Sequence, residues 1–145
     1  MGIQERIIED VGLRGGVDAL TTEKIEATFK SLMAGETGAR MKAYTETCVR
    51  CGLCATACHY AQSHPEDPSY TPAGKVKETM GKLLAASGRL NPQDMYGIAQ
   101  IAYTECNMCR RCVHYCPLGI DTAYIISTMR RLCHKLGVTP QYIQD

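Results

Sequence analysis

Eight of the nine cysteines in this chain fall into two motifs with the same spacing, Cys-x2-Cys-x2-Cys-x3-Cys. The first motif consists of Cys48, Cys51, Cys54 and Cys58, and the second of Cys106, Cys109, Cys112 and Cys116. Thiolates bind both zinc and iron–sulfur clusters, so the spacing has to decide between the two chemistries. Three cysteines at two-residue gaps can wrap one corner of an iron–sulfur cube. The fourth cannot reach around the same cube and ligates a second one.

This spacing predicts two [4Fe–4S] clusters as cofactors, each with three ligands from one motif and one from the other. The predicted ligands of cluster 1 are Cys48, Cys51, Cys54 and Cys116, and those of cluster 2 are Cys106, Cys109, Cys112 and Cys58. Because the last cysteine of each motif binds the cluster of the other motif, the clusters hold the two halves of the chain together. Metal binding and folding should therefore be coupled. Clusters that share ligands in this way lie close enough for electrons to hop between them. We therefore expect electron transfer and predict no catalytic residue.

Other functions for the cysteines compete with this prediction. A structural zinc module would also use paired cysteines. A cluster-sensing regulator would need a basic DNA-binding helix, and none is evident in the sequence. A disulfide scaffold would require a secretory signal and usually an even number of cysteines, and this sequence has neither.

Charge and hydropathy exclude several classes of partner. The 16 basic and 15 acidic residues nearly cancel and Trp is absent, so neither the charge nor the stacking surface of a nucleic-acid binder is indicated. No apolar stretch approaches the roughly 20 residues that span a bilayer, and the N-terminus lacks an apolar signal core. We therefore expect a cytoplasmic chain without a membrane span, whose contact with a membrane is peripheral and made through partner subunits.

Residues next to the ligands leave several roles open. Pro117 follows the last cysteine of the second motif, whereas His59 follows the last cysteine of the first. His59 either donates a hydrogen bond to a cluster sulfur or simply suits the turn. Three arginines within the motifs would either raise the reduction potentials or form a solvated or docking face: Arg50, Arg110 and Arg111.

Three other potential ligands are expected to have different roles. Cys133 lies on the apolar side of the last expected helix, so we expect it to pack in the core as a small hydrophobe. His64 and His114 are expected to be exposed or to lie behind the ligands.

Helical periodicity accounts for most of the chain, and no segment has a convincing strand pattern. A first helix is expected over 2–11, broken by glycines at 12, 15 and 16. A second should begin after Thr21 or Thr22, and a third should cover 39–47.

The rest of the chain predicts a loop followed by three helices. Three prolines predict the loop over 61–74. A helix is then expected from about 76 to 88. Asn91 and Pro92 predict the cap and first residue of the next helix, and Asp121 and Gly137 predict the ends of the last one.

The motifs and the segments around them resemble a known family. The 48 positions from Cys58 to Cys106 exceed the separation in small two-cluster ferredoxins. The segment 67–75, DPSYTPAGK, looks like the DP-x-x-TP segment of heterodisulfide-reductase-like proteins, and 116–121, CPLGID, is similar to their exit from the second motif. Over 43–136 the chain resembles the α-helical ferredoxin domain of succinate dehydrogenase iron–sulfur subunits and of the C subunit of heterodisulfide reductase.

The resemblance implies an all-α fold, with two [4Fe–4S] cluster loops embedded between helices. We expect an N-terminal helical extension at 1–38, the two-cluster domain at 39–137 and a C-terminal tail at 138–145.

The resemblance also implies a relay subunit of a heterodisulfide-reductase-like oxidoreductase complex of anaerobes. Its partners would be other redox subunits, such as a cytochrome b, a flavin subunit or a CCG-domain subunit. Only Cys133 follows the second motif, so a catalytic CCG domain is absent from this sequence and disulfide reduction is not assigned to it. A freestanding soluble ferredoxin and the N-terminal relay part of a longer catalytic subunit are the alternatives.

Overall fold

The computed structural model describes residues 9–144, and every regular element within them is helical. The longer helices are α1 (Val11–Asp18), α2 (Thr22–Met33), α3 (Glu36–Thr47), α7 (Pro92–Thr104) and α9 (Thr122–Leu136). The shorter elements are η2 (Leu53–Ala57), α4 (His59–Ser63), η3 (Pro68–Tyr70), α5 (Pro72–Val76), η4 (Lys77–Gly81), α6 (Lys82–Ala85), α8 (Arg111–Tyr115) and α10 (Gln141–Gln144). The all-α prediction is confirmed. None of the described helices is long and apolar enough to cross a membrane.

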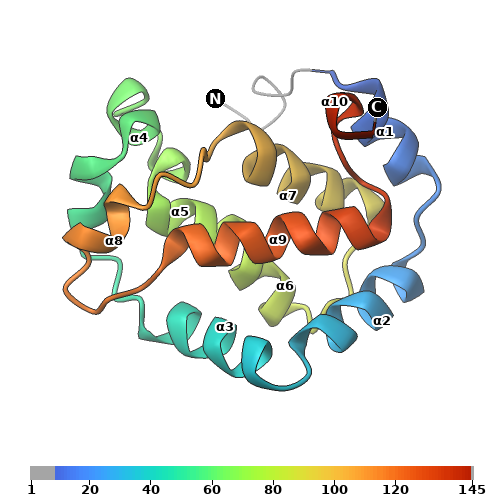
Figure 1. Cartoon of the computed structure of the whole chain (residues 1–145), viewed down its shortest axis with the longest axis horizontal. Helices are drawn as coiled ribbons and strands as arrows, with labels where there is room; N and C mark the ends of the chain where they lie inside the picture. The colour runs from blue at the N-terminus through green and yellow to red at the C-terminus, as the bar shows by residue number, and fades with distance from the viewer. Residues whose placement is uncertain (1–8, 145) are drawn as a thin grey trace.

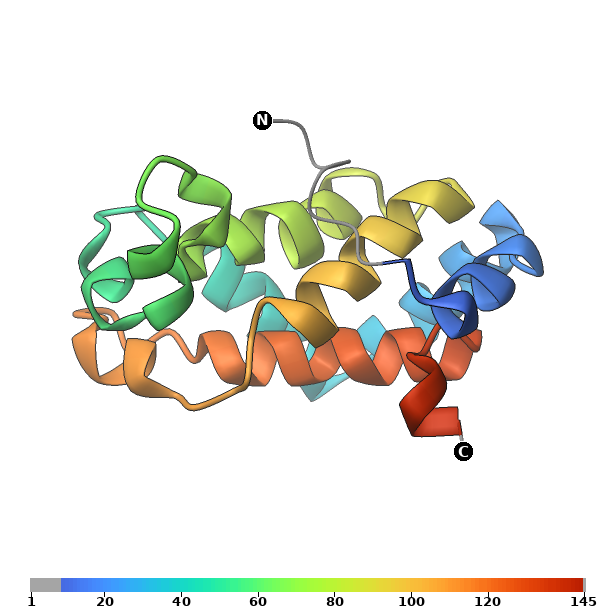
Figure 2. The same cartoon turned by 90° about the horizontal axis from the view of Figure 1, so that it is seen from above.

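Helix α9 runs along the length of the molecule and connects its two ends (Figures 1 and 2). The cysteine loops lie at one end with α4 and α8, and α1, α2 and α10 lie at the other. Helix α7 packs on α9, and α1 packs on α7. One apolar core joins these elements and extends from Leu13 in α1 to Val138 after α9. Residues of the expected N-terminal extension therefore share a core with those that carry the cysteines.

The predicted starts of three helices are confirmed by their caps. Side-chain oxygens of Thr21, Asn91 and Asp121 each accept a hydrogen bond from the backbone N–H three residues later. Pro92 is the first residue of α7, where its missing N–H costs nothing. Gly137 ends α9 in the left-handed conformation, also as predicted.

The prediction that glycines break the first helix is wrong. The expected helix over 2–11 lies largely outside the described residues. The observed helix, α1, begins at Val11 and continues through all three glycines. Asp10 caps it by accepting a hydrogen bond from the N–H of Leu13.

Two of these glycines are required by close packing. An ideal Cβ on Gly16 would lie 2.1 Å from the carbonyl oxygen of Gly137, and one on Gly12 would lie 2.6 Å from the backbone nitrogen of Gln141. Helix α1 thus contacts the C-terminal segment backbone to backbone, which only a residue without a side chain permits.

The predicted loop over 61–74 is also mostly helical. It contains the end of α4, all of η3 and the start of α5, and each of the last two elements begins with a proline. Asp67 and Thr71 cap these two turns, so Pro68 and Pro72 occupy first positions that need no N–H donor. The helix expected from 76 therefore begins at Pro72 and continues through η4, a π-helical turn, into α6.

Candidate metal centres

The two cysteine motifs have left-handed residues at the same positions. Arg50 and Met108 hold matching places in the two motifs, and both have φ of 56°. Gly52 and Arg110 also match, with φ of 84° and 63°. Left-handed residues are uncommon outside glycine and turn the backbone sharply. The sequence repeat is therefore also a structural repeat, and η2 and α8, which follow the left-handed pairs, pack against each other.

Long polar side chains of α9 and its cap hold the second loop in place. The guanidinium of Arg130 donates to the carbonyl oxygen of Ala102 at 2.8 Å and to that of Cys106 at 2.6 Å. Asp121, the cap of α9, accepts a charged hydrogen bond from Arg110 at 2.6 Å. These contacts fix both ends of the loop to one helix.

The first hollow, which we call site 1, is lined by Cys48, Cys51, Cys54 and Cys116. Its volume is about 300 Å³ with its open mouth included. The other lining residues are small or apolar except for Arg50: Val49, Gly52, Ala73, Pro117, Leu118 and Ile120. The backbone N–H of Ile120 donates to the sulfur of Cys116 at 3.4 Å.

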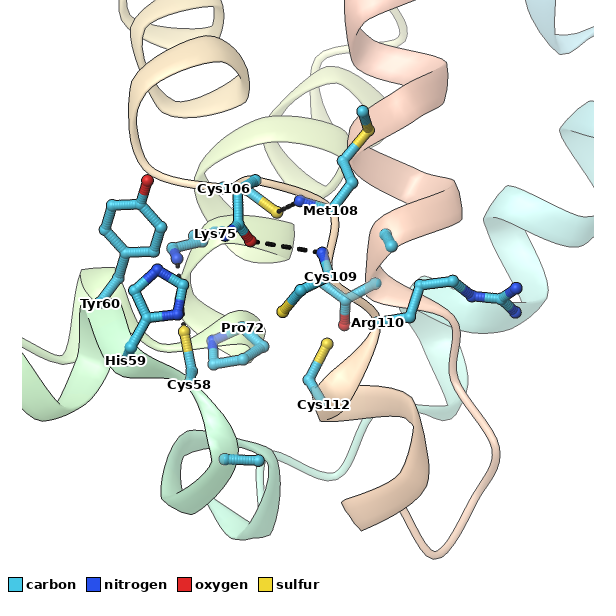
Figure 3. A pocket seen from close by; sticks show the side chains of 14 residues that line it. Cys58, His59, Tyr60, Pro72, Lys75, Cys106, Met108, Cys109, Arg110 and Cys112 are labelled. Carbon is cyan, nitrogen blue, oxygen red and sulfur yellow. Dashed lines mark hydrogen bonds between the residues drawn. The ribbon is translucent and has the colours of Figure 1, made fainter.

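The second hollow, site 2, is lined by Cys58, Cys106, Cys109 and Cys112, and their sulfurs face a common space in Figure 3. Its volume is about 370 Å³, again with the mouth included. The N–H of Met108 donates to the sulfur of Cys106 at 3.4 Å. Each site thus combines three cysteines of one motif with one of the other, in the two sets that the spacing predicts.

Burial raises the pKa of several of these thiols. Loss of solvent raises the pKa of Cys54 and Cys106, and it raises the pKa of Cys112 to about 11. Iron binds the thiolate form of cysteine, so cluster binding must release these protons.

The donor set fits iron–sulfur clusters. Within residues 9–144, no three Cys, His, Asp or Glu side chains converge closely enough to hold a single metal ion. Each set of four thiols instead surrounds a hollow with mostly apolar walls. Such an arrangement suits a multi-iron cluster, whose ligands approach from different directions.

The remaining cysteine and the histidines lie as follows. Cys133 is fully buried in the core, which confirms its predicted packing role. His64 and His114 are both exposed, as predicted, and the ring of His64 stacks on Tyr70 at 3.9 Å between centroids. His59 is exposed at the start of α4 and lines site 2, a placement that fits both of its proposed roles.

One residue of site 2 was missed by the sequence reasoning. Lys75 on α5 is 2% exposed, lines site 2, and donates a hydrogen bond to the sulfur of Cys58 at 3.7 Å. The sequence position of Lys75 could have indicated its burial. At helical spacing it lies three residues after Pro72 and four before Thr79, and both of these residues are buried. A lysine on the buried side of a helix has to find partners in the interior.

Comparisons with known proteins agree with this geometry. The family described as "4Fe-4S dicluster domain" matches residues 44–120, which include both motifs. The chain is 30% identical over 114 residues to Hdr-like menaquinol oxidoreductase iron-sulfur subunit 2 of Archaeoglobus fulgidus, covering 70% of this chain. It is 31% identical over 132 residues to Hdr-like menaquinol oxidoreductase iron-sulfur subunit of Archaeoglobus profundus, covering 83% of this chain.

These matches cover only 20% and 23% of the two relatives' own lengths. No solved structure matches the chain. The family match covers more than half of the chain and contains all eight motif cysteines, and the family is defined by two [4Fe–4S] clusters. The chain therefore belongs to the 4Fe-4S dicluster domain family, whose clusters equip it for electron transfer.

Proposed function

We propose that the eight motif cysteines hold the two clusters in crossed sets. Site 1 would use Cys48, Cys51, Cys54 and Cys116, and site 2 would use Cys58, Cys106, Cys109 and Cys112. The observation that carries this proposal is that these two sets, each drawn from both motifs, line separate hollows. When bound, each cluster supplies a centre that accepts and releases one electron.

The chain's own residues bind, orient and shield the clusters. The thiolates bind iron, and the N–H groups of Met108 and Ile120 donate to ligand sulfurs. Apolar walls around both hollows limit the access of water. Such hydrogen bonds and limited solvent access are among the factors that set a cluster's reduction potential.

Double variants test the crossed ligation. Wild-type protein purified without oxygen should contain about eight irons and eight sulfides. Cys58→Ala and Cys109→Ala should each lose about four irons, and the double variant should lose no more than either alone, because both residues serve site 2. Cys58→Ala combined with Cys51→Ala should lose both clusters, although these cysteines belong to one motif. The reverse pattern would refute the crossed sets.

We further propose that this chain is the electron-relay part of a heterodisulfide-reductase-like oxidoreductase complex. The named relatives, which are subunits of a menaquinol oxidoreductase, support this proposal. Its partners would be a cytochrome b, a flavin subunit or a CCG-domain subunit, on the cytoplasmic side of a membrane. In a second form of the proposal, this chain is the electron-relay part of a longer catalytic subunit. The greater length of the relatives favours this form. In either form, residues 39–137 would be the two-cluster domain, 1–38 its N-terminal extension and 138–145 its tail.

The cluster-bearing end is the proposed contact surface for these partners. Four large apolar side chains are exposed at this end, in and beside the cysteine motifs: Val49, Leu53, Tyr115 and Leu118. The segments 48–65 and 106–120 contain no acidic residue, whereas Arg50, Arg110 and Arg111 are exposed there. Exposed apolar and basic side chains at one end of the molecule fit a partner surface that offers apolar and acidic groups.

Electron exchange with protein probes of opposite charge tests this surface. At low salt, a small acidic flavoprotein should exchange electrons faster than a basic cytochrome, and the difference should shrink as ionic strength rises. Arg111→Glu should slow the acidic probe, whereas Arg14→Glu on α1 at the opposite end should not. Electron-exchange rates that change neither with ionic strength nor in Arg111→Glu would contradict the proposed surface.

A further inference from the structure

Lys75 is a buried charge in the wall of site 2. Its side chain is 2% exposed, and its ammonium donates to the sulfur of Cys58 and to the carbonyl oxygen of Glu105. The same ammonium lies 4.5 Å from the centre of the Tyr60 ring. Figure 3 shows Lys75 and Tyr60 beside this site. A backbone carbonyl, a sulfur and an aromatic face therefore hold the charge beside the ligands of site 2.

Site 1 has no such buried cation among its lining residues. The one basic residue in its wall is Arg50, which is exposed. Backbone hydrogen bonds are present in both sites: a backbone N–H donates to a ligand sulfur at 3.4 Å in each, from Ile120 in site 1 and from Met108 in site 2. In site 1 the backbone of Ala73 also hydrogen-bonds to Cys54. The clearest electrostatic difference between the two hollows is Lys75.

A buried cation affects reduction more strongly than an exposed one. Reduction adds one negative charge to a cluster, and a nearby positive charge stabilises the reduced form. Water and salt screen exposed arginines, whereas the interaction of a buried ammonium is screened much less. Arg110, which also lines site 2, is 65% exposed and is already paired with Asp121.

We propose that the buried ammonium of Lys75 raises the reduction potential of the cluster in site 2 above that of the cluster in site 1. This inference rests on the proposed ligand sets. An electron that enters the chain then resides preferentially on the site 2 cluster. One lysine thereby gives the two clusters unequal affinity for an electron, although the two motifs have equal spacing and matching left-handed positions.

Redox titrations of two Lys75 variants test the proposal. Lys75→Met removes the charge and the hydrogen bond, and Lys75→Gln removes the charge while retaining a donor for the Glu105 carbonyl. Lys77→Met is the matched control, because it removes the same charge two residues away, where the side chain is 60% exposed. The midpoint potentials are followed by EPR, and Cys109→Ala, which keeps only site 1, assigns them.

Wild type should give two midpoint potentials, with the lower one retained in Cys109→Ala. Both Lys75 variants should lower the higher potential and leave the lower one in place, while Lys77→Met should leave both nearly unchanged. A shift in Lys75→Met alone would assign the effect to the hydrogen bond rather than the charge and overturn the proposal. Equal shifts at both sites, no shift, or the loss of about four irons in both variants would also overturn it. By contrast, a wild-type chain without two clusters would refute the ligand sets themselves.

Discussion

Two adjacent glycines of α1 should respond in opposite ways to the same substitution. Gly15 and Gly16 both lie inside the helix, so replacing either by Ala gains about 1 kcal/mol of helix propensity. A Cβ on Gly15 would have nothing within 4 Å. A Cβ on Gly16 would lie 2.1 Å from the carbonyl oxygen of Gly137 and 3.0 Å from the Cα of Val138.

The contact at Gly16 cannot be relieved by a side-chain rotation, because every close atom belongs to the backbone. Overpacking of this kind costs about 1–3 kcal/mol. Gly15→Ala should therefore stabilise the chain by up to about 1 kcal/mol. After its gain in helix propensity, Gly16→Ala should be destabilising by up to about 2 kcal/mol. A chain of this size shifts its Tm by roughly 2–4 °C per kcal/mol, so the variants should differ by several degrees.

The assay is thermal unfolding without oxygen, with both variants and wild type compared at one heating rate, because loss of clusters makes unfolding irreversible. Iron content is the control, and both variants should retain the wild-type amount because α1 lies at the end of the molecule away from the cysteine loops (Figure 1). Equal shifts of Tm in the two variants would refute the close contact of α1 with the segment after α9.

Three further changes test the helices that hold the sites. Arg130→Met removes two hydrogen bonds, including one to the Cys106 carbonyl. The Arg130→Met variant should lose iron from one of its two clusters to a chelator faster than wild type does. The control variant Arg131→Met changes an exposed arginine and should lose iron at the wild-type rate. Asn91→Ala removes the cap of α7 and should cost about 1 kcal/mol, measured as a lower Tm, whereas Asn91→Asp should retain most of it. Burial raises the pKa of the Cys133 thiol from 9.0 to about 12, so its contribution to stability should decline as pH rises from about 9 towards 12. The fall in Tm above pH 9 should accordingly be shallower in Cys133→Ala, and identical slopes would contradict it.

The crossed ligand sets stay a prediction that follows from reach along the chain, and the two hollows are lined by the same groups of cysteines. A fourth cysteine three residues beyond the others cannot close the same cube, and this argument needs no knowledge of the fold. The caps at Thr21, Asn91 and Asp121 were also predictable, since each satisfies N–H groups a few residues away.

The errors arose where a residue serves a distant contact or has two local meanings. Gly16 is required by Gly137, which lies far along the chain, so only its helix-breaking tendency was visible in the sequence. A proline can follow the end of one helix or occupy the first position of the next. Pro68 and Pro72 begin helical turns, because the residue before each of them caps the turn. Lys75 was missed because its partners, Cys58 and the Glu105 carbonyl, meet it only in the folded chain.

Contacts from neighbouring helices explain how the two strained loops are maintained. Left-handed Arg50, Met108 and Arg110 each cost energy that the loops do not recover locally. In the second loop, contacts from the cap of α9 and from Arg130 oppose this cost. The first loop has Gly52 at one left-handed position, and its last cysteine accepts a hydrogen bond from α5 through Lys75. The loops thus match at their left-handed positions but use different supports, one from α9 and the other from a buried lysine beside site 2.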